Sequence, residues 1–350
     1  MKTRRLFYED VYIQEFEAIV LSCEEKDGKY HVILNATAFY PEGGGQPADK
    51  GMIDNIPVVD VQYIDGELCH IMESPLEEGA QVVGKIDWNW RFDLMQQHSG
   101  EHIVSGMIHE KYGYENVGFH MGEEIITIDL SGMLTWQQVQ EIEKKVNYYI
   151  WMNQQVNIFY PDERQRKFIP YRSKKERTGE IRLVEFPGAD LCACCGLHVT
   201  HASQIGLVKI LSCKKFRDGV RMEMLSGKRA LDYLSGSTEQ NSQIAVSLSA
   251  KENETKEAVQ RLLDEVYDLK GQLAQEKQKS FEAKAASFAG KGNVLLIEDT
   301  MEAAEVRKCT DSILNTCGGI AALFAGNDTD GYKYAIGERN GDIKELVKKV

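Results

Sequence analysis

Two clusters of histidine and cysteine, far apart in the sequence, constrain the fold more than any other feature. HSGEH carries His98 and His102, and LCACCGLHVTH carries Cys194 and His198. The region 89–112 is predicted to be a helix, and residues four apart on a helix lie on one face. Zinc binds imidazole nitrogen and thiolate sulfur in a tetrahedral shell. If the clusters form one zinc site, the fold must bring them together.

The second cluster offers more potential ligands than one zinc ion needs. Cys192, Cys195 and His201 flank Cys194 and His198, and the spacing leaves open whether any of them joins the metal shell. Free cysteine is often buried in a protein core. Three thiols within four residues, beside two histidines, nevertheless favour a metal site.

The first cluster is not a metalloprotease motif. In the HExxH motif the glutamate follows the first histidine and acts as general base, whereas Glu101 directly precedes the second histidine. Glu101 is also expected to point away from the helix face that carries His98 and His102. The sequence therefore argues against a protease and identifies no general base.

Composition indicates a cytoplasmic protein. The chain has eight cysteines, and those outside the cluster are scattered singly, unlike a disulfide framework. No apolar run approaches the about 20 residues that span a bilayer. The N-terminus, MKTRRLFYEDVY, has acidic and aromatic residues where a signal peptide has an apolar core.

Charge is unevenly distributed along the chain. The net charge of −13 argues mildly against a nucleic-acid partner, but an acidic protein can bind RNA through one basic face. Residues 163–177 carry seven lysines or arginines against two glutamates, and a second basic stretch covers 209–229. A solvated charged loop explains the same pattern. The candidate RNA contacts are Arg164, Arg166, Lys167, Arg172, Lys174, Lys175 and Arg221.

Hydrophobic patterning predicts an α+β protein with several domains. Apolar runs within 10–86 flank the Asp-Gly pair at 65–66, which is a strong hairpin signal, and indicate a small antiparallel barrel or sandwich. We take the barrel as the expectation. The predicted domains are a β-barrel with a Gly-rich loop at 1–88, a zinc-binding α+β core at 89–232, a helical linker at 233–290 and a small α/β domain at 291–350.

A Gly-rich loop, TAFYPEGGGQPADKG, interrupts the predicted barrel. Gly43, Gly44 and Gly45 permit backbone conformations that other residues resist, and they allow another chain to approach closely. The aromatic-proline entry and the polar exit, which includes Gln46, favour a loop that builds a site over a plain connection.

An apolar stripe follows the polar region 233–257. Val259, Leu262, Val266, Leu269 and Leu273 recur at spacings of three and four, as in a helix that packs on a partner helix. We expect self-association, as a homodimer, through residues 258–275 or the domain that follows.

The order of these motifs resembles the editing domain of alanyl-tRNA synthetases and their free-standing relatives, the AlaX-type editing proteins. That family's pattern is a Gly-rich loop after Thr-x-Phe-Tyr, then His-x3-His, then Cys-x3-His. The resemblance covers roughly residues 8–230, and Arg91 also matches. The remainder is similar to the helical linker and DHH-associated domain of alanyl-tRNA synthetases and longer AlaX proteins.

The resemblance implies a zinc-dependent hydrolase that removes serine, or also glycine, from tRNA(Ala). A site built for alanine cannot strongly reject serine or glycine, so a second site must discriminate. The hydroxyl of Thr37 is the implied reader of serine. The implied metal ligands are His98, His102, Cys194 and His198. The implied substrate contacts are Thr37, Gly43, Gly44, Gly45, Gln46, Phe119 and His120.

The chain departs from the family pattern at several positions. Cys195 and Leu197 replace a glycine and a threonine, which would reshape the pocket, and Phe119 and His120 stand where the synthetases often carry glutamine. The glycine-rich final segment of the C-terminal domain is missing. The aminoacylation domain is missing too, so the chain is not expected to charge tRNA by itself.

Two other functions fit the same motifs. Threonyl-tRNA synthetases carry a related domain that edits seryl-tRNA(Thr), although the FYPEGGGQP loop favours the alanine branch. The other is a non-catalytic RNA-binding protein in which zinc is structural. Four protein ligands would close the zinc shell, which supports this reading. The sequence does not decide whether zinc activates water or holds the substrate's amino group.

Overall fold

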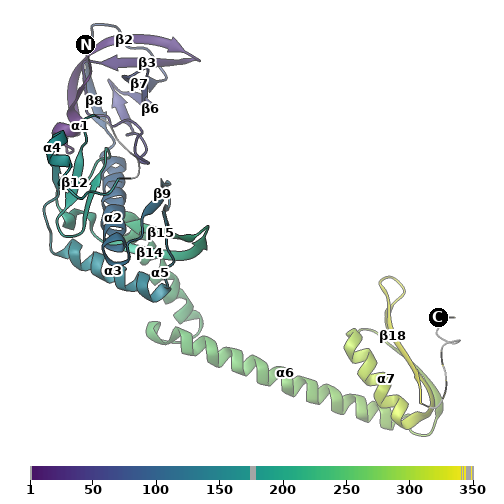
Figure 1. The fold of residues 1–350 in the computed structure, drawn as a ribbon. Coiled ribbons are helices and arrows are strands. Elements are labelled where there is room, and N and C mark those ends of the chain that lie inside the picture. Colours follow the sequence, from purple (N-terminus) through teal and green to yellow (C-terminus); the bar gives the residue numbers. More distant parts are fainter. Residues whose placement is uncertain (1, 174–178, 340, 342, 344–347, 349–350) are drawn as a thin grey trace. The chain divides into compact units, whose positions relative to one another are not determined.

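In the computed structural model, residues 2–173, 179–339, 341, 343 and 348 are described. The chain divides into two units, Met1–Thr238 and Glu239–Val350, and Figure 1 shows the elements of each. The multidomain α+β class expected from the sequence is confirmed.

Six strands near the N-terminus close into a barrel in the order β2-β3-β7-β6-β5-β8. All neighbouring pairs are antiparallel. Asp65 and Gly66 have positive φ and form the turn of the β6–β7 hairpin, as the sequence predicted. The strand bounds are β2 (Glu15–Lys26), β3 (Lys29–Leu34), β5 (Gly51–Ile53), β6 (Ile56–Ile64), β7 (Glu67–Met72) and β8 (Gln81–Ile86).

A short N-terminal segment packs beside the barrel. The strand β1 (Arg4–Arg5) pairs in parallel with β4 (Ala36–Thr37), and α1 (Leu6–Glu9) follows. Phe7 and Tyr40 are buried and make an edge-to-face ring contact of 5.5 Å between centroids. This contact joins the chain's start to the Gly-rich loop.

The helix α2 (Trp88–Tyr112) is the centre of the first unit. It begins after Asp87, whose side chain accepts a hydrogen bond from the Trp90 N–H, and it ends at Gly113 in the left-handed conformation. These ends agree closely with the predicted helix 89–112. Every residue from Leu94 to Ile108 is buried, because α3 (Trp136–Trp151), β13 (Asp190–Ala193), β15 (Gly219–Ser226) and the 3-10 turn η1 (Ala202–Ile205) surround the helix.

Two small sheets and one helix complete this core. One sheet has the order β14-β15-β10-β9 and the other β11-β12-β13. The bounds are β9 (Asn116–Met121), β10 (Ile126–Leu130), α3 (Trp136–Trp151), β11 (Asn157–Phe159), α4 (Glu163–Arg166), β12 (Leu183–Phe186), β13 (Asp190–Ala193), η1 (Ala202–Ile205), β14 (Val208–Phe216) and β15 (Gly219–Ser226).

A buried ion pair joins the barrel to α2. Arg91 is fully buried and pairs with Asp49, which follows the Gly-rich loop. The same guanidinium donates to the carbonyls of Val11, Ile13 and Ala38. Every donor group of this side chain therefore meets an acceptor, as a buried charge requires.

The region predicted as a helical linker, 233–290, is largely helical. The helix α5 (Gly227–Ser247) runs through its first part, and the boundary between the units falls within this helix. Serine and glutamine are tolerated in an exposed helix, so the polar composition of this region is compatible with α5. The 3-10 turn η2 (Glu252–Glu254) and the long helix α6 (Thr255–Ala286) follow.

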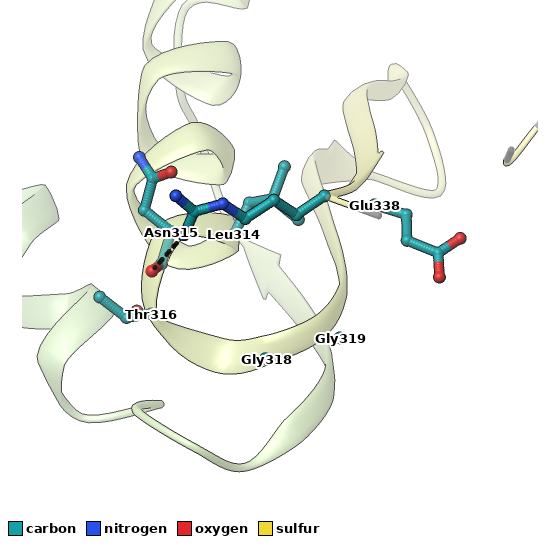
Figure 2. Close-up of a pocket in the computed structure, with 7 residues that line it drawn as sticks. Leu314, Asn315, Thr316, Gly318, Gly319 and Glu338 are labelled. Atoms are coloured by element: carbon teal, nitrogen blue, oxygen red, sulfur yellow. Dashed lines mark hydrogen bonds between the residues drawn. The ribbon is translucent and has the colours of Figure 1, made fainter. Parts of the chain in front are cut away.

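The second unit ends in a small α/β layer. The helix α7 (Ala303–Cys317) packs on the sheet β16-β17-β18, whose bounds are Gly292–Glu298, Gly318–Asn327 and Gly331–Glu338. The sequence also predicts a helix at the end of this domain, and its residues fall largely outside the described ones. A cavity of about 340 Å³ lies beside the end of α7, where Arg339 donates to the carbonyl of Asn315. Figure 2 shows residues that line it, among them Leu314, Asn315 and Thr316. None of its described lining residues is a histidine or cysteine.

No helix within the described ranges has the length and apolar character needed to cross a membrane.

Candidate metal centre

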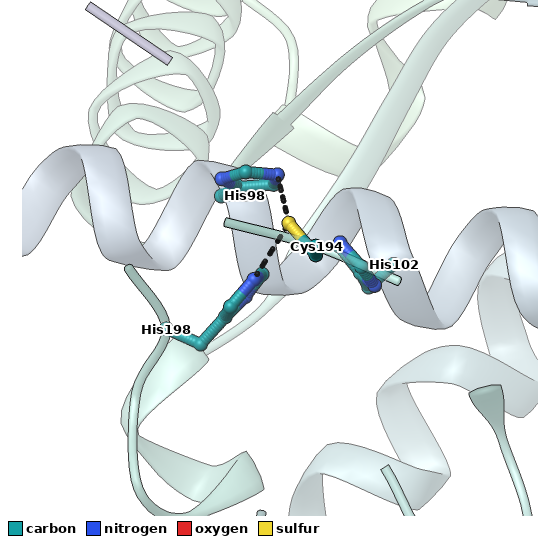
Figure 3. Close-up of side chains that lie close together, drawn as sticks. All are labelled: His98, His102, Cys194 and His198. Atoms are coloured by element: carbon teal, nitrogen blue, oxygen red, sulfur yellow. Dashed lines mark hydrogen bonds between the residues drawn. The ribbon is translucent and has the colours of Figure 1, made fainter. Parts of the chain in front are cut away.

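The structure brings the two sequence clusters together. Figure 3 shows His98 and His102 projecting from α2 toward Cys194 and His198, which come from the turn after β13. One ligand atom from each of the four buried residues lies within 4.8 Å of the others. The Sγ of Cys194 lies 3.5 Å from Nε2 of His98 and 3.4 Å from Nε2 of His198. A thiolate among three imidazoles is a donor set that zinc accepts.

Gln46 fixes which nitrogen of His98 faces the cluster. Its Oε1 accepts from the backbone N–H of Leu197 at 3.0 Å and lies 2.9 Å from Nδ1 of His98. Because an amide N–H can only donate, this side of Gln46 must carry the oxygen, and Nδ1 of His98 must donate to it. Nε2 is then left with its lone pair toward Cys194, ready for a metal ion.

The other two histidines are held in the same way. Nδ1 of His102 lies 2.8 Å from Oδ2 of Asp190, and Nδ1 of His198 lies 3.2 Å from Oγ of Ser99. Each imidazole thus has a partner for its outer nitrogen, which orients the ring and turns Nε2 toward the cluster. The arrangement fits a bound metal ion without rearrangement of the four side chains.

The cluster also has the electrostatics of a metal site. Burial acts to raise the pKa of the Cys194 thiol, but the neighbouring His98 and His102 outweigh it and hold that pKa well below its usual value. Burial acts to lower the pKa of His102, but the Cys194 thiolate and the hydrogen bond to Asp190 raise it to about 10. Burial and the other histidines lower the pKa of His198. A thiolate is therefore favoured at the centre of the cluster, as a metal ligand requires.

The neighbours that spacing left open occupy different places. Cys192 forms a second group with His102 and Asp190, and its Sγ donates to the carbonyl of Ala193. Cys195 is partly exposed and its Sγ lies 3.9 Å from the Tyr40 hydroxyl, outside the four-residue group. His201 caps η1 and contacts Thr200.

A cavity of about 400 Å³ opens beside the cluster. The Phe119 ring forms one wall and stacks on the His98 ring, with 5.4 Å between centroids. Among its described lining residues none carries a carboxylate. The lining is Gly44, Gly45, His98, His102, Val117, Gly118, Phe119, Cys192, Ala193, Cys194 and Cys195.

The glycine turn touches the mouth of this cavity. Gly43 and Gln46 exchange backbone hydrogen bonds of 3.0 and 3.1 Å, and the φ angles of Gly44 and Gly45 are +66° and +86°. A Cβ at Gly44 would lie 2.9 Å from Sγ of Cys195, and one at Gly45 would lie 2.8 Å from the Phe119 ring. Both conformation and space therefore demand glycine.

In the glycine turn, only some of the backbone N–H donors remain available. The Gly43 N–H is taken by the carbonyl of Gln46. Among the hydrogen bonds of the described residues, none uses the N–H of Gly44 or Gly45.

Thr37 does not line the cavity, contrary to its expected role as the reader of serine. It is fully buried in the barrel region, where its hydroxyl lies 2.8 Å from Nε2 of His70 and accepts from the Phe39 N–H. Nδ1 of His70 faces the carbonyl of Val32 and must donate, so Nε2 accepts the hydroxyl proton of Thr37. The hydroxyl is thus committed to the fold.

Acidification should destabilise the protein through His70. Burial lowers its pKa from 6.5 to about 4, so the unfolded chain takes up this proton at higher pH than the folded chain. The contribution of neutral His70 is fully present above about pH 6.5 and is lost as the pH falls toward about 4. When the pH is lowered from 7.5 to 5, the protonation of His70 should reduce the free energy of unfolding by about 2 kcal/mol. Urea titrations at the two pH values measure this loss. His70→Gln should lose less stability over that interval, and an equal loss in both proteins would contradict the assignment.

His120 and Gln46 reach a second cavity, of about 360 Å³, which shares Gly45 with the first. The Lys50 ammonium lies over the Trp90 ring in this cavity, 3.6 Å from its centroid. Gln46 was expected to contact substrate, but the hydrogen bond to His98 gives it a part in the metal centre instead.

The first group of predicted RNA contacts is only partly free. Arg164 and Lys167 are exposed at the α4 helix, while Arg166 donates to the Gly179 carbonyl and is mostly covered. Lys174 and Lys175 lie outside the described residues.

The remaining predicted RNA contacts are paired with carboxylates. Arg172 is largely covered and bonded to Asp190, and Arg221 makes two hydrogen bonds to Asp129. Arg172 therefore cannot reach a phosphate without breaking its contact with buried Asp190. RNA contact at this residue stays a prediction.

Sequence reasoning missed three residues that build the site. Asp190 and Ser99 hold metal-site histidines, and Arg182 donates to the carbonyls of Cys194 and Gly196, which shapes the ligand turn. One signal was available. Asp190, Cys192 and Cys194 stand at every second position of an extended segment, and residues two apart in a strand share a face.

Fold and site define a two-unit α+β protein with a buried candidate metal centre beside a glycine turn. Comparison with known proteins agrees with this description. Residues 5–90 match the family model of class II (A) tRNA synthetases, and residues 181–222 match the second additional domain of threonyl and alanyl tRNA synthetases.

Individual relatives agree with the domain matches. Alanyl-tRNA editing protein Aarsd1-B of Xenopus laevis is 34% identical over 270 residues, covering 72% of this chain and 66% of that protein. AlaX-L of Pyrococcus horikoshii is 28% identical over 349 residues, covering 93% of this chain and 86% of that protein. Alanine–tRNA ligase of Ignicoccus hospitalis is 35% identical over 243 residues, covering 66% of this chain and 26% of that protein. The chain belongs to the family of alanyl-tRNA editing proteins related to alanyl-tRNA synthetase. It spans about two thirds of the length of the Aarsd1-type relatives.

Proposed function

We propose that this protein is a zinc-dependent hydrolase that removes wrongly attached serine from tRNA(Ala), with glycine as a second substrate. The observation that carries the proposal is the buried His98, His102, Cys194 and His198 cluster at the wall of a cavity of about 400 Å³. A cavity of this size suits the aminoacyl end of a tRNA. The family's alanyl-tRNA editing proteins supply the substrate class.

The four-residue cluster is the proposed zinc site. Bound zinc would either activate water or orient the substrate's amino group, and four protein ligands favour the second role because they close the tetrahedral shell. Asp190, Gln46 and Ser99 hold the three imidazoles, so the site is preorganised for the ion.

The glycine turn would bind the scissile ester. The N–H groups of Gly44 and Gly45 have no acceptor among the described residues, and both glycines line the cavity beside the cluster. Such donors stabilise the negative charge that develops on a carbonyl oxygen during ester hydrolysis. Phe119 would cover the acyl group and exclude water from the His98 side.

Selection for serine would depend on polar groups that line this cavity. Thr37 is committed to His70, so we place the selection in the Cys195 thiol and the Gly44–Gly45 backbone. A site whose buried polar groups pair with a serine hydroxyl rejects alanine, which leaves those groups unpaired.

Among the described residues that line the cavity, none carries a carboxylate that could act as general base. Glu101 is buried, but its carboxylate accepts from Ser105 and Asn116 and does not line the cavity. We therefore propose that water reaches the ester without a carboxylate base. The same observation favours the rival function, a tRNA-binding protein with structural zinc.

The exposed basic surface at α4 would contact the acceptor stem. Arg164 and Lys167 are exposed there, next to Phe168, which is 86% exposed. A basic segment beside an exposed aromatic ring is a common RNA-binding combination.

Deacylation assays test the function. Seryl-tRNA(Ala) should lose serine rapidly and glycyl-tRNA(Ala) more slowly, while alanyl-tRNA(Ala) and seryl-tRNA(Thr) should be spared. Release of serine from tRNA(Thr) alone would assign the protein to the threonine branch. Binding of tRNA(Ala) without release of any amino acid would support the structural-zinc alternative.

We also propose a homodimer through α6. Its apolar stripe is exposed along much of the helix, with Leu262 at 47% and Leu269 at 53% exposure. Burial of such a stripe against a second copy would remove apolar surface from water. Sedimentation at micromolar concentration should give a dimeric mass, and Leu262→Glu with Leu269→Glu should give a monomer. A monomeric wild-type protein would refute the dimer.

A further inference from the structure

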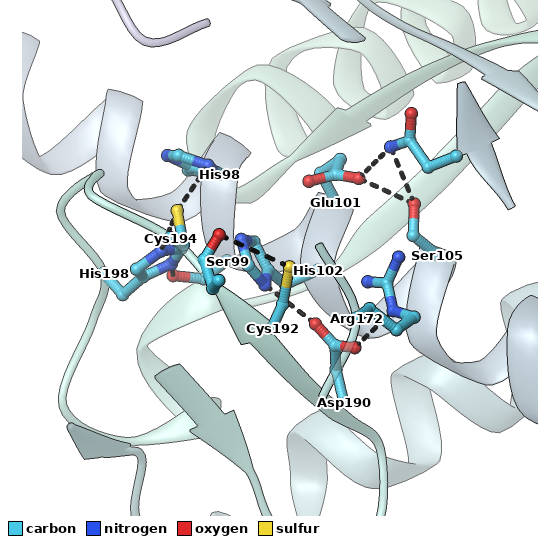
Figure 4. A network of polar contacts seen from close by, with 12 residues as sticks. His98, Ser99, Glu101, His102, Ser105, Arg172, Asp190, Cys192, Cys194 and His198 are labelled. Atoms are coloured by element: carbon cyan, nitrogen blue, oxygen red, sulfur yellow. Dashed lines mark hydrogen bonds and ion pairs between the residues drawn. The ribbon is translucent and has the colours of Figure 1, made fainter. Parts of the chain in front are cut away.

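The metal-site residue His102 is the end of a chain of buried polar groups. Its Nδ1 lies 2.8 Å from Oδ2 of Asp190, whose other oxygen accepts from Nε of Arg172 at 2.7 Å. The side chains of His102, Asp190 and Arg172 are 4%, 1% and 11% exposed. Figure 4 shows the three in sequence, with Asp190 between the other two.

Backbone pairing places Arg172 in this chain. Its N–H donates to the carbonyl of Leu191 at 2.8 Å, and its carbonyl accepts from the N–H of Ala193 at 2.9 Å. The segment at Arg172 therefore lies against β13, which carries Asp190 and leads directly into Cys194. One strand thus delivers a metal-site thiol at its end and the carboxylate that orients His102 at its start.

The charges on these groups explain why both are needed. A carboxylate with almost no exposure needs a countercharge and filled hydrogen bonds, and Arg172 supplies the charge while His102 supplies a donor. Because both carboxylate oxygens are engaged, Asp190 has a defined orientation.

We infer that Asp190 and Arg172 are positioning residues of the metal centre, which hold the His102 ring so that Nε2 faces Cys194. Arg172 thereby serves the metal site, although the sequence placed it among the RNA contacts. This inference rests on the proposed zinc site. It goes beyond the four ligands by assigning a purpose to the buried pair that supports one of them.

Zinc affinity is the appropriate test, because it reports ligand orientation directly. Loss of a partner that orients a metal-bound histidine weakens metal affinity by about 10- to 100-fold. Asn has only one acceptor oxygen, whereas both His102 and Arg172 donate to Asp190. If the amide oxygen of Asp190→Asn accepts from His102, its N–H₂ group faces the guanidinium of Arg172, and two donors oppose each other. We expect Asp190→Asn and Arg172→Leu to weaken zinc binding by that factor, measured by competition with a chelator. Arg172→Lys should recover part of the loss, because it restores the charge.

A matched control separates positioning from general stability. Asp93 of α2 and Arg229 of α5 form another largely buried ion pair, with side chains 16% and 12% exposed, but neither belongs to the metal group. Asp93→Asn should lower the melting temperature and leave zinc affinity within about 2-fold of wild type. Cobalt-substituted protein gives a second readout, because its visible absorption reports ligand geometry and should change in Asp190→Asn and Arg172→Leu but not in Asp93→Asn.

Two results would overturn the inference in distinguishable ways. Wild-type zinc affinity in both Asp190→Asn and Arg172→Leu would refute the positioning role and leave the metal centre intact. A wild-type protein that takes up no zinc would refute the metal centre itself, and the inference with it.

Discussion

Cys194→Ala is expected to abolish zinc binding and to lower the deacylation of seryl-tRNA(Ala) by about 100-fold or more. Sγ of Cys194 lies within 3.5 Å of Nε2 of both His98 and His198, so this atom connects the cluster. It is also the only sulfur in the four-residue group. Without the thiolate the remaining imidazoles carry no negative charge to attract a divalent cation. Metal analysis of the purified variant and single-turnover deacylation measure the two losses.

Cys195→Ala is the matched control for this variant. It changes the adjacent thiol, which lines the cavity but lies outside the four-residue group. It should keep one zinc ion per chain, while discrimination between serine and alanine changes. Full zinc content in Cys194→Ala would show that the ligand set is wrong.

Arg91→Met is expected to destabilise the first unit by about 3–5 kcal/mol, because it leaves a buried carboxylate without its countercharge. Asp49 has no exposed surface, and burial already acts to raise its pKa against the opposing effect of Arg91. The substitution also removes the donors that reach the carbonyls of Val11 and Ile13. In a unit of this size the melting temperature should fall by roughly 10 °C. Thermal unfolding followed by circular dichroism measures the change.

An exposed ion pair provides the comparison. Arg4 and Glu9 also make two hydrogen bonds, but their side chains are 68% and 46% exposed. Exposed pairs contribute little, so Glu9→Gln should leave the melting temperature unchanged. A similar fall in Glu9→Gln and Arg91→Met would show that burial of the pair is not the source of the effect.

Much of the site could be predicted because its signals are local. His98 and His102 share a helix face through a spacing of four, and Cys194 and His198 are joined by one tight turn. The barrel hairpin at 65–66 and the stop at Gly113 were readable for the same reason, since turn chemistry is written in neighbouring residues.

What could not be predicted depends on long-range contacts. The partner of Thr37 is His70 on the barrel strand β7, far along the chain, so no local pattern showed that its hydroxyl was already engaged. Arg172 lies in a basic segment, and only its pairing with β13 shows that its charge is directed inward to Asp190. Composition also could not show that α5 continues through the polar region, because the same residues form linkers and exposed helices.

Restoration of activity by zinc tests the central claim most directly. The protein should be stripped with a chelator, and the release of serine from seryl-tRNA(Ala) measured before and after addition of one equivalent of zinc. We expect the stripped protein to be inactive, and zinc to restore serine release while alanyl-tRNA(Ala) stays intact. Undiminished serine release by metal-free protein, or no release by zinc-loaded protein that still binds tRNA(Ala), would contradict a zinc-dependent editing hydrolase.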